Sequence, residues 1–576
     1  MYLKRCGQSR AHRDGDFWVL VESQRTKRGP RQRVVAYLGD MEKVACVGVK
    51  QAAMDRPGSW QSRLFDEEGE PEWVEVDSKR VRVERVRDFG GYWLGLQLLD
   101  KLDLVALLER LLPVGREEIP WPMMALTLVL MRLCEPSSEL RIAEHSYERS
   151  VLGDLLGIPA EKVNDDRLYR ALDRLLPRKE ELEKHLKERM GELFGLEYDL
   201  LLYDITSTYF EGACENNEKA RFGYSRDKRS DCKQVCIGLV VSREGMPLGY
   251  EMFAGNRADV STVTEMVEKI ERQYGKAKRI WVMDRGMISE KTLALLRSEG
   301  RRYIVGTPRG QLRQFEGELS SGEGWEEIAE GLSAKLMAAE SGKEWFILCR
   351  SKARGSKEKA MLARFEERIE AGLRELGAAC AGEKKLRQAT VERRVGALLG
   401  KNSRAKGLFK VEVGSRGDGG ASIAWARQGR PAQWAALKEG CYLLRTNVEG
   451  KVEELWRSYI QLTEAEAAFR IEKSDLRIRP IWHQKEDRVQ GHILVCFLAY
   501  VLRKTLAQMC KGAGLGDEPR KVFDEIAQIK VVDVVMPTRG GVTIRKRCIA
   551  QPTKPQAILL QRLGLQLPQR MKVQEV

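Results

Sequence analysis

The chain has 576 residues, and its 99 lysines and arginines outnumber 84 aspartates and glutamates, for a formal charge of +15. At roughly 100–200 residues per domain, this length predicts about three or four structural units with a large buried core. The positive balance favours an acidic partner such as nucleic acid. No uninterrupted apolar run approaches the roughly 18 residues of a membrane-spanning helix, which argues against a membrane partner.

The N-terminus and the cysteines predict the compartment. Residues 1–5 lead into polar sequence without the apolar segment of a secretory signal. The twelve cysteines are scattered, and the closest pair, Cys232 and Cys236, has the spacing of neither a zinc site nor a redox motif. We therefore expect reduced cysteines in a cytoplasmic, nucleoid-associated protein.

The first predicted unit, residues 1–60, is a small β unit. Apolar runs at 17–21 and 34–38 flank a basic turn. Residues 85–195 instead have the apolar spacing of helices and form the second unit.

The helical unit is a candidate DNA-binding or dimerisation domain. Short helices are expected at 138–150, 151–156 and 165–176. A helix-turn-helix could be built from them, with residues 166–170 opening the recognition helix. A plain helical bundle fits the same pattern.

Strands and helices alternate in residues 196–307. The expected elements are strands at 200–204, 234–242 and 247–253, a helix at 261–274, a strand at 280–284, a helix at 289–299 and a strand at 303–306. This order reproduces an RNase H-like fold, an α/β core with a mixed sheet in which the first and fourth strands are neighbours.

Residues 308–440 do not continue this alternation, and we expect an insertion there, with a charged helical stretch at 358–376 among Gly-rich loops and short strands. The core resumes at 441–505 with a strand and helices. Residues 506–576 are expected to form a basic C-terminal region.

Two of the predicted core strands end on an aspartate, Asp204 and Asp284. Burying a carboxylate costs several kcal/mol unless a cation or hydrogen bonds compensate for the lost hydration. Because the two strands are neighbours in the expected fold, both side chains would face one cation. For either residue alone, a strand-end turn or a helix cap is the alternative.

A third acid, Glu466, lies on a predicted helix with Tyr459 and Lys473, and positions seven apart nearly eclipse on a helix. Three adjacent carboxylates would repel, whereas two divalent cations about 3.5–4 Å apart would keep them ionised and hold the oxygens of a phosphoryl transfer. Hard oxygen ligands favour Mg²⁺, with Mn²⁺ as a substitute. The alternative for Glu466 is a capping box with Thr463.

The histidines nearest these residues are His483 and His492. A histidine can relay a proton or bind a metal, but with five histidines in the chain and no clustered pair we expect both to be packing residues.

The residues described so far resemble the DDE transposases of bacterial insertion sequences, in the branch named for its YREK signature. Tyr459, Glu466 and Lys473 match the signature's spacing, whereas Leu462 stands at its arginine position. Further similarity lies in the segment order over residues 195–505 and in Gly255-Asn256, Phe469-Arg470, Lys473-Ser474 and residues 479–483.

The resemblance implies that Asp204, Asp284 and Glu466 bind the catalytic metal ions in an RNase H-like core with a largely β insertion. It implies cleavage at the inverted ends of a mobile element, followed by attack of a 3′-hydroxyl on target DNA, by an oligomer assembled on DNA.

Phosphate contacts are also implied by the resemblance. Tyr459 would donate a hydrogen bond near the cut and Lys473 would act as a point charge. Leu462 cannot make the bidentate contact of an arginine, and Arg470 is the neighbour that could take this role. Two alternatives remain: a nuclease or resolvase with the same fold that never joins strands, and a non-catalytic DNA-binding relic.

Overall fold

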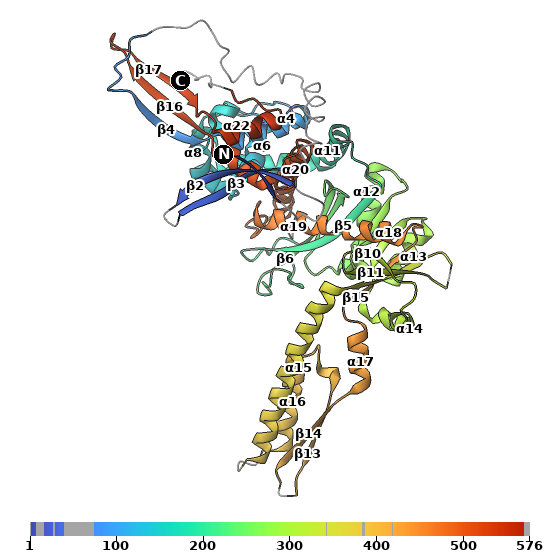
Figure 1. Cartoon of the computed structure of the whole chain (residues 1–576). Helices are drawn as coiled ribbons and strands as arrows, with labels where there is room; N and C mark the ends of the chain where they lie inside the picture. The colour runs from blue at the N-terminus through green and yellow to red at the C-terminus, as the bar shows by residue number, and fades with distance from the viewer. Residues whose placement is uncertain are drawn as a thin grey trace.

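The computed structural model describes residues 2–6, 17–26, 29–39, 74–340, 342–382, 386–417 and 419–568. The molecule is elongated (Figure 1). A sheet-based core lies at its centre, helices from the N-terminal half gather with the C-terminal segments at one end, and an arm formed by α15, α16, β13, β14 and α17 projects from the other.

The central sheet contains the expected RNase H-like order. Its strands run β7-β6-β5-β8-β9, with β5, β6 and β7 antiparallel and with β8 parallel to both β5 and β9. The bounds are Leu200–Tyr209 for β5, Gln234–Ser242 for β6, Pro247–Ala254 for β7, Ile280–Met283 for β8 and Arg302–Gly306 for β9. The prediction of a mixed α/β core is therefore confirmed.

Both faces of these strands are covered, and side chains alternate between the two cores. Leu201 and Tyr203 pack with the helices α12 and α13, whereas Leu200 and Leu202 pack into the larger core that includes α19 and α20. These helices are α12 (Val263–Tyr274), α13 (Glu290–Ser298), α18 (Val452–Ile460), α19 (Thr463–Ser474) and α20 (Glu486–Gly512). Asp204 is two residues after Leu202, so its side chain points to the same face of the sheet, the face covered by α19.

The sheet extends into the stretch expected to be an insertion. Beyond β9 it continues through β15, β12, β11 and β10, each antiparallel to its neighbour. Their bounds are Glu326–Ala329 for β10, Leu332–Ala338 for β11, Trp345–Ser351 for β12 and Cys441–Thr446 for β15, with α14 at Glu316–Ser320.

The rest of that stretch, residues 352–440, is the arm. It contains α15 (Lys352–Ala381), α16 (Gln388–Lys401), the hairpin β13–β14 (Phe409–Ser415 and Ala421–Arg427) and α17 (Gly429–Leu437). Apolar side chains such as Ile369, Leu373 and Val391 form a core of its own. The largely β insertion implied by the resemblance is therefore wrong, because apolar residues at helical spacing produce a helix of 30 residues.

Residues 90–194 are helical, and four of their helices, α4, α6, α10 and α11, pack against α20. The helices of this stretch are α4 (Gly90–Lys101), α5 (Leu104–Leu111), α6 (Trp121–Cys134), α7 (Glu139–Arg141), α8 (Tyr147–Arg149), α9 (Leu152–Leu156), α10 (Asp165–Leu175) and α11 (Lys179–Phe194). A π-helical turn, Ile142–Ser146, joins α7 to α8. By length and composition α20 could cross a membrane, but 83% of its most apolar window is buried in the fold, as in the core helix of a globular unit.

Two smaller sheets complete the described parts. One is formed by β1 (Tyr2–Cys6), β2 (Phe17–Thr26) and β3 (Gly29–Gly39). The other joins segments from opposite ends of the chain: β4 (Arg82–Asp88), β16 (Lys530–Pro537) and β17 (Thr543–Ile549), near α21 (Pro519–Ala527) and α22 (Lys554–Arg562).

Candidate functional site

The fold brings Asp204 and Asp284 onto adjacent strands. In the parallel pair β5–β8, Tyr203 is the partner of Met283, so each aspartate is the next residue along its strand. Asp284 follows the end of β8, as predicted. Asp204 does not end its strand, because β5 continues to Tyr209 through pairing with β6.

The environment of Asp204 disfavours a lone negative charge. Burial raises the pKa of this carboxyl to about 6, the negative charges of Glu466 and Asp284 add to this effect, and the amide of Ile205 and the guanidinium of Arg226 oppose it. The Ile205 N–H donates to Asp204 Oδ1 at 2.8 Å. Three carboxylates that repel one another around a half-buried position indicate a place for a cation.

Glu466 approaches this position from α19. Its side chain is exposed and makes no ion pair or side-chain hydrogen bond with any described residue. The capping box is absent, because Leu462 is the N-cap residue and the Thr463 hydroxyl donates to the Ile460 carbonyl instead. Glu466 is therefore available as a ligand.

Tyr459 contacts the second aspartate. Its hydroxyl donates to Asp284 Oδ1 at 3.3 Å, and burial, together with the charge of Asp284, raises the pKa of the phenol. The predicted single helical stripe is not continuous, because α18 ends at Ile460 and α19 begins at Thr463. Tyr459 and Glu466 thus reach the site from two consecutive helices.

Lys473 lies two helical turns after Glu466 on α19 and pairs with a residue that the sequence alone does not identify. Its Nζ donates to Asp227 Oδ1 at 2.9 Å, and Arg479 donates to the same oxygen. Asp227 belongs to the loop between β5 and β6 and is 5% exposed. In the sequence, this loop is marked only by a cluster of basic residues between positions 226 and 233.

Arg226, next to Asp227, fixes that loop against the core. Its backbone N–H donates to the Ser207 hydroxyl at 3.2 Å, and its guanidinium donates to Asp259 Oδ2 at 2.6 Å. Since its charge also lowers the pKa of Asp204, Arg226 is a cation of the site itself.

The leucine at the signature's arginine position and the neighbour that could replace the arginine behave differently. Leu462 is 7% exposed and belongs to the large core. Arg470 is exposed, one helical turn beyond Glu466, and has no ion-pair partner among the described residues. The fold leaves Arg470 free for an external anion but does not bring it into contact with another site residue.

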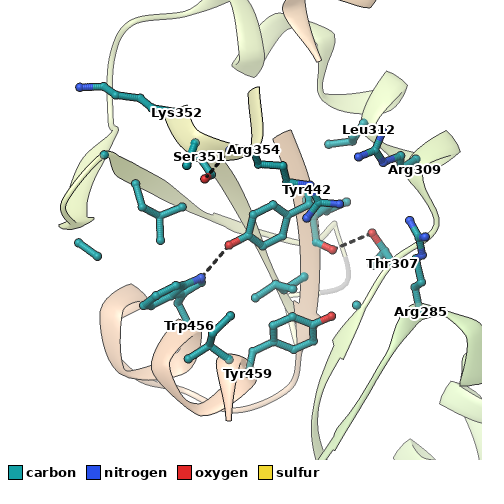
Figure 2. A pocket seen from close by; sticks show the side chains of 18 of the residues that line it. Arg285, Thr307, Arg309, Leu312, Ser351, Lys352, Arg354, Tyr442, Trp456 and Tyr459 are labelled. Carbon is teal, nitrogen blue, oxygen red and sulfur yellow. Dashed lines mark hydrogen bonds between the residues drawn. The ribbon is translucent and has the colours of Figure 1, made fainter. Parts of the chain in front are cut away.

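A cavity of about 670 Å³ opens beside Asp284 and Tyr459, between the end of the RNase H-like sheet, α18 and the start of the arm. Figure 2 shows its side chains, with Tyr442 and Trp456 facing each other. The Trp456 indole N–H donates to the Tyr442 hydroxyl at 2.7 Å. The cationic lining residues are Arg285, Arg309, Lys352 and Arg354.

Two of these four cations share one carboxylate. Arg309 and Arg354 both pair with Glu358, whereas Arg285 and Lys352 have no ion pair with a described residue. A cavity with free cations and aromatic rings beside a carboxylate cluster suits a phosphate-bearing ligand. The sequence alone does not reveal this cavity, since the lining residues come from segments distant in the chain.

The histidines form a separate, buried network. His492 Nδ1 faces the Arg132 guanidinium at 3.3 Å and Nε2 lies 3.1 Å from the Ile478 carbonyl, which satisfies both ring nitrogens. His483 Nε2 lies 3.4 Å from Glu139 Oε2. Although ligand atoms of Glu139, His483 and His492 lie within 4.8 Å of one another, the adjacent arginine disfavours a cation. The packing interpretation is the better one.

A family profile described as "Transposase DDE domain" matches residues 196–502, more than half of the chain. The chain belongs to this transposase family. Among solved structures, it is similar to one described as "Cryo-EM structure of piggyBac transposase synaptic complex with hairpin DNA (SNHP)", with 9% identity, a TM-score of 0.36, and coverage of 79% of this chain and 82% of that one. No curated protein sequence matches it.

The chain is thus a DNA transposase, an enzyme that cleaves and joins DNA with the help of divalent metal ions. The donor set fits this cofactor class, because Asp204, Asp284 and Glu466 offer hard carboxylate oxygens and repel one another when all are ionised. A bound divalent cation would supply Lewis-acid stabilisation of the phosphoryl oxygens in this transposase.

Proposed function

We propose that Asp204, Asp284 and Glu466 are the catalytic, metal-binding residues of a transposase of the YREK branch, which moves a bacterial insertion sequence. The ions are Mg²⁺, with Mn²⁺ as a substitute, and two are held. The observation that best supports this is electrostatic: Glu466 and Asp284 both act on the half-buried Asp204 from separate elements of the fold.

The neighbouring side chains then bind and orient the DNA. The Tyr459 hydroxyl keeps its proton over the working pH range, since the pKa of this group is raised, and it orients Asp284 or donates to a phosphate. Lys473 and Arg470 supply positive charge along α19. The cavity beside Asp284 takes the phosphodiester next to the cut, with Arg285 and Lys352 as its free cations.

The substrates are the inverted ends of the element and a target duplex, and the active form is a homo-oligomer on DNA in the cytoplasm, associated with the nucleoid. The net charge of +15 supports a DNA partner in general terms.

The test is incubation of purified protein with labelled DNA that carries the element's ends and with a target duplex, in Mg²⁺, Mn²⁺ or EDTA. Asp204→Ala, Asp284→Ala and Glu466→Ala should each abolish nicking and joining while end binding is retained. Glu464→Gln is the matched control on the same helix, because Glu464 pairs with Lys504 rather than with the site.

Each outcome decides between functions. Metal-dependent nicking at the ends and joining to target, lost in the three alanine variants, supports the proposal. Cutting without joining would indicate a nuclease or resolvase, and binding without either reaction would indicate a DNA-binding relic. Normal cutting by Glu466→Ala would remove that residue from the triad.

A further inference from the structure

The arm carries most of the net charge of the chain. Residues 352–440 contain 20 lysines and arginines and 10 aspartates and glutamates, a net charge of +10 out of +15. Figure 1 shows that the arm stands away from the catalytic core, so this charge lies outside the candidate site, apart from Lys352 and Arg354, which line the cavity. A charge excess of this size on a projecting element favours binding of an anionic partner at the arm itself.

Helix α16 presents a cationic face to the outside of the arm. Its buried residues, Val391 and Val395, pack into the arm core. On a helix of 3.6 residues per turn, Arg393 lies on the side opposite these two residues, and Arg394 and Lys401 lie on one flank, about 80–100° around the helix from it. All three are exposed, and they share one outward surface, here called the α16 face.

The cations of the α16 face are free, unlike many others in the arm. The side chains of Arg393, Arg394 and Lys401 make no ion pair or hydrogen bond with any described residue. The helix's one acid, Glu392, lies on the flank opposite Arg394 and Lys401, where it accepts a hydrogen bond from Gln388.

Other cations of the arm are neutralised by acidic partners. The pairs are Arg374–Glu370, Lys410–Glu412 and Arg427–Glu366. The positive potential of the α16 face is therefore not cancelled locally, whereas that of these three residues is.

The shape of the α16 face allows a close approach. Between the cations lie Gly396, Ala397 and Gly400, and a Cβ placed on either glycine would have no neighbour within 4 Å. The cations from Arg393 to Lys401 span about 12 Å along the helix axis. This length matches three to four phosphates of one DNA strand, at about 3.4 Å each.

We infer that the α16 face binds the phosphate backbone of duplex DNA beyond the point of cleavage. The inference rests on the proposed function, since it assigns a second contact to the same DNA substrate. The binding is independent of base sequence, because it uses charge against phosphate. Its role is to hold the flanking duplex in register while the catalytic core acts on the end.

The test compares two triple variants that remove the same charge from the same arm. Arg393→Gln/Arg394→Gln/Lys401→Gln removes the free cations, and Arg374→Gln/Lys410→Gln/Arg427→Gln removes the paired ones. The probe is a labelled duplex that extends at least about 15 base pairs past the cleavage point, which at about 3.4 Å per pair covers the length of α15, about 45 Å. Affinity is measured by fluorescence anisotropy over a series of salt concentrations.

The first variant should bind at least about tenfold more weakly near 0.1 M salt, with a slope of log affinity against log salt smaller by about three, at 0.9 per lost phosphate contact. The second should change the slope by less than about one. Equal losses in both variants, or no loss in the first, would overturn the inference.

Wild-type cleavage at the ends is assayed in parallel. If the wild-type protein cuts and the two triples bind alike, the α16 contact is wrong and the proposed function stands. If the wild-type protein binds the duplex but does not cut in Mg²⁺, the proposed function fails, and the comparison of the two triples still decides whether the α16 face binds DNA. Melting temperatures of both triples should equal that of the wild type, because all six side chains are at least half exposed or lie on outward faces.

Discussion

Asp227 and Lys473 form an ion pair of 2.9 Å that joins the β5–β6 loop to helix α19. The aspartate accepts from both Lys473 and Arg479 on one oxygen, and its other oxygen is buried with no hydrogen-bond partner. Burial lowers the pKa of Lys473, and Asp227 opposes that shift. Asp227 therefore keeps the lysine charged and fixes its position beside the carboxylate cluster.

The first prediction concerns Asp227→Asn. Without the carboxylate, Lys473 and Arg479 repel each other, and burial lowers the lysine pKa further. We expect single-turnover cleavage to slow at least about tenfold, equivalent to about 1.4 kcal/mol, and the alkaline limb of the rate–pH profile to move to lower pH. Single-turnover nicking measured across pH on end-labelled DNA checks both effects.

The control for Asp227 is Asp231→Asn in the same loop, because Asp231 is exposed and pairs with Arg229. It should leave rate and profile unchanged. Lys473→Ala combined with Asp227→Asn should be no slower than Lys473→Ala alone, since the aspartate acts through the lysine. Additive losses, or an unshifted alkaline limb, would make Asp227 a merely structural residue.

The second prediction concerns the contact of Tyr459 with Asp284. Tyr459→Phe removes the hydroxyl at 3.3 Å and keeps the ring. Cleavage should slow about fivefold, the rate equivalent of one hydrogen bond of about 1 kcal/mol, with DNA affinity little changed.

Gly306→Ala offers an independent way to disturb the same contact. A Cβ at this position would lie 2.6 Å from the Tyr459 hydroxyl and 3.1 Å from the Arg285 amide. We expect a loss similar to that of Tyr459→Phe and little further loss when the two changes are combined. Fully multiplicative losses in the double variant would separate Gly306 from the tyrosine.

The order of the core strands could be predicted because it depends on local signals. Apolar runs of strand length, turns and segments with helical spacing are all visible between Leu200 and Gly306. Their order along the chain is that of an RNase H-like fold. The attachment of β10, β11 and β12 to the same sheet could not be predicted. It depends on β15 pairing with both β9 and β12, contacts between segments more than 90 residues apart in the chain.

The same distinction holds for the site. The sequence identifies the three acids by two signals. Asp204 and Asp284 each follow an apolar run of strand length, and Glu466 has the spacing of the YREK signature to Tyr459 and Lys473. No such signal identifies Asp227. It lies among basic residues, and its contact with Lys473 arises only from the tertiary fold. The break between α18 and α19 could not be predicted either, because the helical spacing of apolar residues continues across it.

The third prediction addresses the leucine at the signature's arginine position. Leu462 is 7% exposed in the large core, so an arginine there would bury an unpaired charge. Leu462→Arg should lower the melting temperature markedly and fail to increase cleavage. Leu462→Met, of similar volume, should be close to wild type. A stable and faster Leu462→Arg enzyme would show that the position faces the DNA after all.

The last prediction is the acid sensitivity of the buried histidine network. Burial, aided by Arg132, lowers the pKa of His492 to about 3, so the unfolded chain, with an ordinary histidine pKa near 6.5, binds the extra proton first as the pH falls. This contribution to stability is complete above about pH 6.5 and is lost progressively toward pH 3, by on the order of 2 kcal/mol between pH 7 and 5. Glu139, whose pKa its partner His483 lowers to about 2 against the effect of burial, adds a loss only below about pH 4.5.

Urea midpoints at pH 7 and 5 measure this effect. His492→Gln should be less stable at pH 7, because it disturbs the contacts to Arg132 and to the Ile478 carbonyl, but should lose clearly less stability than the wild type on going to pH 5. The exposed His145→Gln is the matched control and should keep the wild-type difference. If His492→Gln retains the full wild-type loss, the acid sensitivity arises elsewhere and the histidine is not its source.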